Sequence, residues 1–202
     1  MAGPPTKSVF LNLPYDRAFE PLYLAYVVGI IKLGLKVQLT LAVPNDIGRL
    51  DTIIDLIQHC EYSIHDLSRI QPNSSGIPRF NMPLELGLAL YRSRTTNGEH
   101  RVYIFEQENY RIQQSTSDLN GLDPNIHDGT PKGIMAQLRN VFLRESETST
   151  VPEMIAAYRS VKRVLPRIKE KAGAKSLFAA AVFRDIVLAT NILKKEEGVT
   201  NS

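Results

Sequence analysis

The sequence predicts an α/β fold, in which a doubly wound parallel sheet of about five strands carries helices on both faces. The first observation behind this prediction is that short apolar runs alternate with segments of helical length, a pattern typical of parallel strands joined by right-handed helical crossovers. The second is that the chain has 202 residues, 43% of them hydrophobic and 22% charged. That size and composition suit one α/β core with an added segment.

The expected elements follow from hydrophobic periodicity and from breakers. A short apolar run that ends at Pro14 favours a buried first strand. Gly34 is a stop signal near the end of the first expected helix, 18–35. The run after Gly34 alternates polar and apolar residues, as a second strand does. The expected strands are 8–13, 36–41, 61–66 and 101–105, and a fifth strand is poorly marked in the sequence. The expected helices are 18–35, 50–60, 82–90 and 133–143.

Asp66 lies at the carboxyl end of the third expected strand, the edge at which doubly wound sheets bind ligands. The segment 68–81 that follows is rich in Ser, Pro, Asn, Gly and Arg. A loop of that length in a compact domain is usually functional. We expect the neighbouring His65 to be a structural histidine whose hydrogen bonds are satisfied inside the protein.

The helix after this loop is expected to begin near Pro83, which suits a first-turn position because its missing N–H is not needed there. Asn81 or Met82 would be its cap, and Asn is the better capping type. The run 82–90 is apolar on nearly every side, which predicts a buried helix.

Glu85 lies within that apolar run, and a buried carboxylate is costly unless something pairs with it or uses it. Gly87, two residues on, weakens a helix interior and is best explained by close approach of another backbone or a ligand. An alternative interpretation is that Glu85 only interacts favourably with the N-terminus of its own helix.

The chain is predicted to divide into an α/β domain over 1–147 and a C-terminal helical extension over 148–202. Two helices are expected in the extension, 152–171 and 176–195, and Pro166 should kink or divide the first of them. The second is strongly apolar, so we expect it to pack on the domain or on a second subunit, which favours a homo-oligomer formed through these helices.

Charge is distributed unevenly along the chain. Residues 1–150 hold 14 basic and 16 acidic residues, whereas residues 151–202 hold 10 and 5. Such a basic segment can contact nucleic acid or an acidic partner. A solvated helix face is the commoner reason for it, so nucleic acid is not among the expected partners.

Several classes of site are excluded. The single cysteine, Cys60, rules out a disulfide framework and a multi-cysteine zinc site, and the four histidines lack metal-ligand spacing. Neither a dinucleotide fingerprint nor a P-loop is present, so we expect no metal and no cofactor. The start MAGPPTKS has no apolar signal region, and Arg184 and Asp185 interrupt the last apolar stretch. We therefore expect a cytoplasmic protein with no membrane contact.

Four stretches form an ordered set of motifs: FLNLPYD at 10–16, YSIHDLS at 62–68, NMPLELGLA at 81–89 and SDLNG at 117–121. The first looks like the strand-and-loop opening of TIR-like domains. The second and third resemble the paired signature shared by TIR-like and nucleoside 2-deoxyribosyltransferase-like proteins, and the fourth resembles a later Asp-containing turn of that superfamily. The resemblance covers residues 8–143.

The resemblance implies a flavodoxin-like fold and cleavage or transfer of N-glycosidic bonds in a nucleoside, a nucleotide or NAD. The helix-borne glutamate of the superfamily is its catalytic carboxylate, and it carries over to Glu85. The aspartate that ends the third strand carries over to Asp66. Breaking a C1′–N bond builds positive charge on the sugar, and a carboxylate close to C1′ can stabilise that charge or attack to form a glycosyl ester.

Further residues are candidates for substrate binding. Tyr15 could stack on the base, and Arg79, like Arg69, could bind phosphate in a bidentate manner. Exposed loop charges are an equally good interpretation of the two arginines. The full set of substrate-binding candidates is Asn12, Tyr15, Asp16, Arg79, Asn81 and Asp118.

Two functions therefore compete. The first is an enzyme that cleaves or transfers the N-glycosidic bond, including a nucleotide-degrading effector of bacterial defence. The second is a binding module with the same fold and an inactive site, which senses a nucleotide or assembles with other TIR-like chains.

Overall fold

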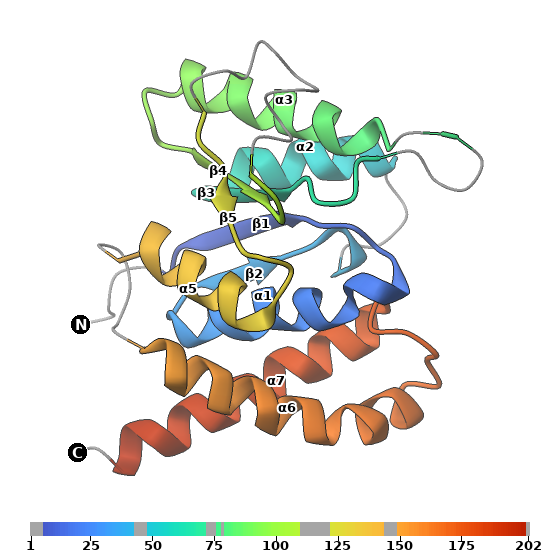
Figure 1. Ribbon diagram of the computed structural model, residues 1–202, viewed down its shortest axis with the longest axis vertical. Coiled ribbons are helices and arrows are strands. Elements are labelled where there is room, and N and C mark those ends of the chain that lie inside the picture. The colour runs from blue at the N-terminus through green and yellow to red at the C-terminus, as the bar shows by residue number, and fades with distance from the viewer. Residues whose placement is uncertain are drawn as a thin grey trace. The chain divides into compact units, whose positions relative to one another are not determined.

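In the computed structural model (Figure 1), the residues described are 6–42, 48–71, 76–77, 79–109, 122–143 and 149–200. Within them, five strands form an all-parallel sheet in the order β2-β1-β3-β4-β5, and helices flank this sheet. The predicted α/β class and flavodoxin-like architecture are thereby confirmed. The strands are β1 (Ser8–Asn12), β2 (Lys36–Gln38), β3 (Tyr62–Asp66), β4 (Arg101–Glu106) and β5 (Asn125–Ile126). The α-helices are α1 (Glu20–Lys32), α2 (Arg49–His59), α3 (Asn81–Thr95), α5 (Pro131–Val141), α6 (Val151–Lys171) and α7 (Ala180–Thr200).

The register of the sheet aligns the carboxyl ends of its central strands. Asn12 pairs with His65 across β1 and β3, and Asp66 pairs with Phe105 across β3 and β4. In this strand order the chain runs from β1 to β2 in one direction and from β3 to β4 in the opposite direction, which places the topological switch point between β1 and β3. Ligands of doubly wound folds bind in the crevice outside such a point.

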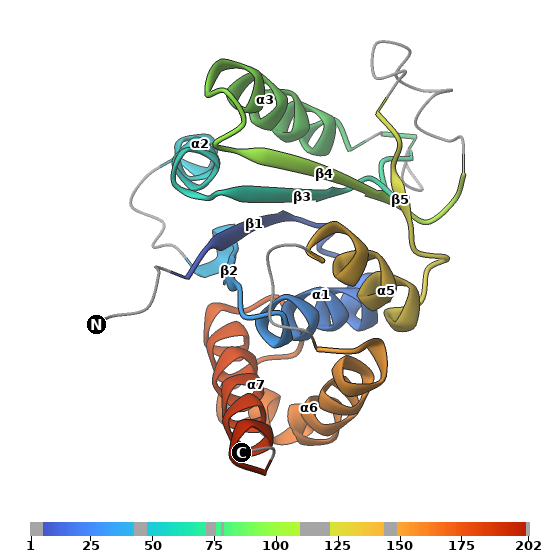
Figure 2. The same ribbon diagram turned by 90° about the vertical axis from the view of Figure 1, so that its left-hand side faces the viewer.

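The described chain groups into two compact units. The first comprises 1–14 and 38–129, and the second comprises 15–37 and 130–202. In the first unit, α2 and α3 lie side by side, and α3 packs on β3 and β4 (Figure 2). In the second unit, α1 packs against α5, α6 and α7. The predicted boundary between 147 and 148 stays a prediction.

Close packing in the second unit depends on a glycine. A Cβ on Gly29 of α1 would lie 2.7 Å from Leu138 Cδ1 of α5 and 3.2 Å from Met154 Cε of α6. Any larger residue would therefore require the ends of the Leu138 and Met154 side chains to shift. Across α7, Val182, Phe183 and Ile186 are buried, so this helix has the apolar packing face that its sequence predicts.

Several element bounds differ from the sequence-based expectation. Strand β2 is only three residues long, because Thr40–Ala42 forms a 3₁₀-helix where the strand was expected to continue. Helix α6 runs unbroken through Pro166, so the proline does not divide it. Among the described residues, no helix is both long enough and apolar enough to cross a membrane.

Helix α3 differs more substantially. Its N-cap is Phe80, without a side-chain hydrogen bond, so Asn81 is the first helical residue and neither Asn81 nor Met82 is the cap. The expectation that the run 82–90 is buried on all sides is wrong: Leu84 is 56% exposed, and Gly87 is also exposed. A Cβ on Gly87 would meet no atom within 4 Å in the described structure, so no backbone there accounts for this glycine. Apolar composition alone did not show which face packs.

Candidate functional site at the carboxyl edge of the sheet

Asn12 connects the end of β1 to the first turn of α3. Its side-chain nitrogen Nδ2 donates to the Met82 carbonyl oxygen at 3.2 Å and lies 3.0 Å from His65 Nδ1. The amide is buried, with 5% exposure. Strand ends β1 and β3 and the start of α3 therefore meet at the switch point, where a ligand is expected in this fold class.

Glu85 lies one turn further along α3, on the buried side of the helix. The buried residues of α3 are Met82, Glu85, Leu86 and Ala89, whose spacing defines one helical stripe. Glu85 is the charged member of that stripe, and its two apolar neighbours Met82 and Leu86 pack in a cluster with Leu67 and Ile104. Its carboxylate thus lies in apolar surroundings with 6% exposure.

Burial raises the pKa of Glu85 to about 7, and the positive charge of Arg49 on α2 opposes this shift only in part. Within the part of the chain that the structure describes, the Glu85 side chain makes no hydrogen bond and no ion pair. A carboxylate in this state is near half ionisation at neutral pH. Groups with such perturbed pKa values are enriched at functional sites.

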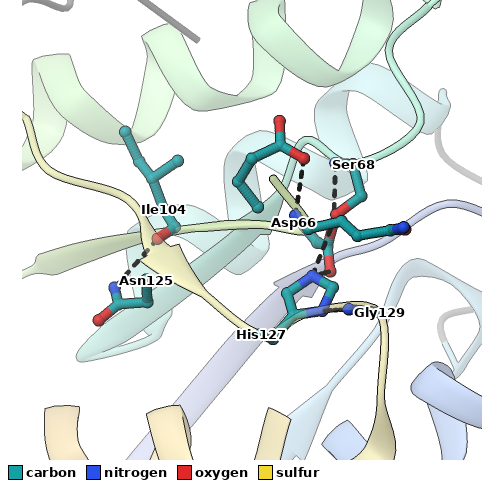
Figure 3. A network of polar contacts seen from close by, with 8 residues as sticks. Asp66, Ser68, Ile104, Asn125, His127 and Gly129 are labelled. Atoms are coloured by element: carbon teal, nitrogen blue, oxygen red, sulfur yellow. Dashed lines mark hydrogen bonds and ion pairs between the residues drawn. The ribbon is translucent and has the colours of Figure 1, made fainter. Parts of the chain in front are cut away.

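Asp66, the second predicted catalytic residue, is wholly buried and hydrogen-bonded inside the protein. Its Oδ1 accepts from the Ser68 backbone N–H at 2.9 Å, and its Oδ2 lies 3.2 Å from His127 Nε2. The Ser68 hydroxyl lies 3.0 Å from the same nitrogen, so both side chains converge on His127 (Figure 3). This arrangement ties the turn after β3 to the segment after β5.

The contacts of His127 fix its tautomer. The Gly129 backbone N–H donates to His127 Nδ1 at 3.1 Å, which makes Nδ1 an acceptor. The ring proton is therefore on Nε2, which donates toward Asp66 and Ser68. Because Asp66 and Ser68 share one ring nitrogen, His127 is not aligned as the base of a Ser-His-Asp triad.

Glu106 ends β4, one residue after Phe105, which pairs with Asp66, and it is also fully buried. Its Oε1 accepts from the Gln107 backbone N–H at 2.7 Å. The sequence signal for Glu106 is an acid directly after an expected strand, and Glu106 is not among the candidates named above. His127 had no comparable signal, because β5 before it has only two residues.

The other predicted substrate-binding residues lie in varied places. Arg79 is half-buried in the segment before α3, and Asn81 is exposed at the start of that helix. Tyr15 and Asp16 belong to the second unit: the Tyr15 ring lies 5.2 Å from the Phe178 ring, and Asp16 Oδ1 accepts from the Phe19 N–H at 3.0 Å. Asp118 lies outside the described residues.

In the described ranges, no three His, Cys, Asp or Glu side chains group closely enough to hold a metal ion. No model of a known protein family matches the sequence, and no curated protein shows significant similarity to it. The function is therefore inferred from the residues of the site itself.

Proposed function

We propose that the protein cleaves or transfers the N-glycosidic bond of a nucleoside, a nucleotide or NAD, with Glu85 as its catalytic carboxylate. The observation that carries the proposal is the buried acid Glu85, which has no hydrogen-bond or ion-pair partner among the described residues and lies on the helix that begins at the switch point. Keeping such a group costs stability, which favours a role that uses the carboxylate.

Cleavage of the N-glycosidic bond can proceed with one carboxylate placed near C1′. The C1′–N bond breaks, its electron pair leaves with the base, and positive charge develops on the sugar ring. The ionised Glu85 oxygen then stabilises C1′ or bonds to it as a glycosyl ester, which water or a second base opens. Low exposure around Glu85 strengthens its attraction for that charge, because little water screens it.

One observation favours the alternative, an inactive module that senses a nucleotide. Both Asp66 oxygens already accept hydrogen bonds from inside the protein, so Asp66 is engaged as a structural group of the strand end. A module of this kind would bind a nucleotide at the same edge of the sheet without releasing the base.

Glu85→Gln separates the two functions. The full chain, the variant and the exposed-site control Glu99→Gln are incubated with NAD, AMP and adenosine, free base is measured by chromatography, and affinity is measured by calorimetry. We expect base release to fall at least about 100-fold in Glu85→Gln while affinity stays within a few-fold, because a charge that acts in the transition state is lost. Equal turnover would remove Glu85 as the catalyst. Binding without any turnover by the wild type would favour the sensor.

A further inference from the structure

A buried chain of polar side chains runs through the first unit from Asn12 to Cys60. His65 Nε2 lies 3.1 Å from Ser63 Oγ, which lies 3.0 Å from His100 Nε2, and His100 Nδ1 lies 2.7 Å from the Cys60 carbonyl oxygen. Together with the contacts of Asn12 to His65 and Met82, this gives five contacts in one line. Ser63, His65 and His100 have no exposed surface.

The direction of every hydrogen bond in this chain follows from its two ends. The Cys60 carbonyl only accepts, so His100 Nδ1 carries a proton and its Nε2 accepts from the Ser63 hydroxyl. The single Ser63 proton is then used, so the Ser63 oxygen accepts from His65 Nε2–H. His65 Nδ1 is left as an acceptor, and the Asn12 amide N–H donates to it.

The Met82 end of the chain requires the same hydrogen-bond directions. The Met82 carbonyl also only accepts, so it takes the second Asn12 N–H. With both histidines neutral, the four side chains supply five hydrogens for the five contacts. Burial lowers the pKa of both His65 and His100, which agrees with the neutral forms that the geometry requires.

The orientation of the Asn12 amide is therefore fixed, and its oxygen is left over. In the described structure, Oδ1 of Asn12 has no hydrogen-bond partner, yet it is not among the fully buried polar atoms without one, which are the Tyr23 hydroxyl and Arg92 Nε. The small exposure of Asn12 thus includes this oxygen, at the end of β1 beside the switch point.

The geometry points to Asn12 as a ligand contact that can only accept, held in that orientation by the relay of His65, Ser63 and His100. Resting on the proposed function, it implies that a donor of the nucleoside, its 2′-hydroxyl, its 3′-hydroxyl or the amine of the base, faces Asn12. A phosphate or carboxylate oxygen would be repelled there. His65, Ser63 and His100 act as positioning residues, because they set the amide without touching the ligand.

The relay is tested without any ligand by the histidine tautomers. Long-range ¹H–¹⁵N spectra of the full chain at pH 7 should show His65 protonated on Nε2 and His100 protonated on Nδ1, two opposite neutral tautomers. In Ser63→Ala the coupling between the rings is broken, whereas Ser63→Thr keeps the hydroxyl and should keep both tautomers. Thr190→Val removes another buried hydroxyl, in α7, and serves as the control. The relay is wrong if the wild type shows His65 protonated on Nδ1 or doubly protonated.

The ligand contact is tested with four probes: adenosine, 2′-deoxyadenosine, 3′-deoxyadenosine and inosine. Asn12→Ala should weaken adenosine binding about 3- to 10-fold, the usual value of one hydrogen bond between uncharged groups. The analogue that lacks the donor facing Asn12 should bind weakly to the wild type and lose nothing further in Asn12→Ala. Ser63→Ala should show part of the same loss, and Ser63→Thr should restore affinity.

The pattern across the analogues identifies the donor as a 2′-hydroxyl, a 3′-hydroxyl or the base amine. An Asn12→Ala protein that weakens all four probes equally, or none of them, would overturn the contact. A wild type that binds no probe would remove the contact together with the proposed ligand class, while the tautomers would still decide the relay. Base release from NAD by a wild type with the wrong tautomers would refute the relay and leave the proposed function standing.

Discussion

Two buried polar regions of the first unit differ in how they are satisfied. The relay of Asn12, His65, Ser63 and His100 has a partner for every hydrogen that it carries. Glu85, one turn along α3 from the contact with Asn12, has no hydrogen-bond partner in the described part of the chain and a pKa raised to about 7. The same carboxyl edge of the sheet thus holds a network in which every hydrogen has an acceptor, next to a carboxylate without a hydrogen-bond partner in the described residues.

This difference distinguishes a structural role for the relay from a functional role for Glu85. A buried polar group with all its partners is compatible with stability and fixes one arrangement of its neighbours. A buried group without partners costs stability, so its retention needs another explanation, which we find in a ligand or a transition state. Four experiments test this contrast, in order of the effect expected.

The largest expected effect is a loss of folding stability at low pH, caused by protonation of His65 in the relay. Burial lowers the pKa of His65 from 6.5 to about 3. Between these two pH values His65 is protonated in the unfolded chain and neutral in the folded protein. Stability is therefore present above pH 6.5 and lost as the pH falls toward 3, by up to about 5 kcal/mol. Urea unfolding at pH 7 and pH 4 should show about 3 kcal/mol of this loss. His65→Asn, which keeps an acceptor for Asn12 and does not titrate, should show a much flatter dependence, and equal slopes in both proteins would contradict the assignment.

Glu85 should show the opposite sign. Its pKa rises from 4.5 to about 7 on folding, so the folded protein keeps a proton that the unfolded chain has released. Stability is present below pH 4.5 and lost as the pH rises through 7, by up to about 3 kcal/mol. Glu85→Gln should equal the wild type at pH 4 and exceed it by that amount at pH 8, in the same unfolding assay. A variant less stable than the wild type at pH 8 would reveal a partner for the carboxylate.

Asp66, like the relay, has partners for its side chain: both carboxylate oxygens contact groups of the protein. Asp66→Asn replaces Oδ2 by an N–H group that faces His127 Nε2–H, and His127 is unable to switch tautomer while its Nδ1 accepts from Gly129. Two opposed donors should cost about 1–3 kcal/mol in unfolding free energy. Asp55→Asn is the control, because the Asp55 side chain is 66% exposed and should change stability by less than about 0.5 kcal/mol. A neutral Asp66→Asn would mean that the network adapts.

The smallest effect concerns the exposed side of α3. Gly87→Ala fills open space in a helix and should raise the unfolding free energy by about 0.5–1 kcal/mol. Gly98 also borders open space, but its φ of +83° makes Gly98→Ala destabilising. Thermal melts of the two variants should therefore shift in opposite directions. A Gly87→Ala protein that loses affinity for adenosine would restore the interpretation that a ligand approaches this glycine.

The sequence predicted much of the fold for local reasons. Apolar runs such as 8–13 and stop signals such as Gly34, whose φ is +79°, place strands and helix ends without knowledge of the rest of the chain. The prediction failed where local signals are weak or symmetric. Strand β5 has two residues, and α3 is apolar around most of its circumference, so its buried face was not identifiable beforehand.

Glu85 could be singled out because a charge inside an apolar run is visible in the sequence, and Asp66 because it ends a strand. The partners of these residues were decided by the tertiary structure. Asn12, His65 and His100 are brought together by parallel pairing of β1, β3 and β4, and His127 reaches Asp66 across 61 residues of chain. Residue type and spacing along one element are local properties, whereas the direction of a hydrogen-bond chain depends on which donors and acceptors from separate strands come into contact.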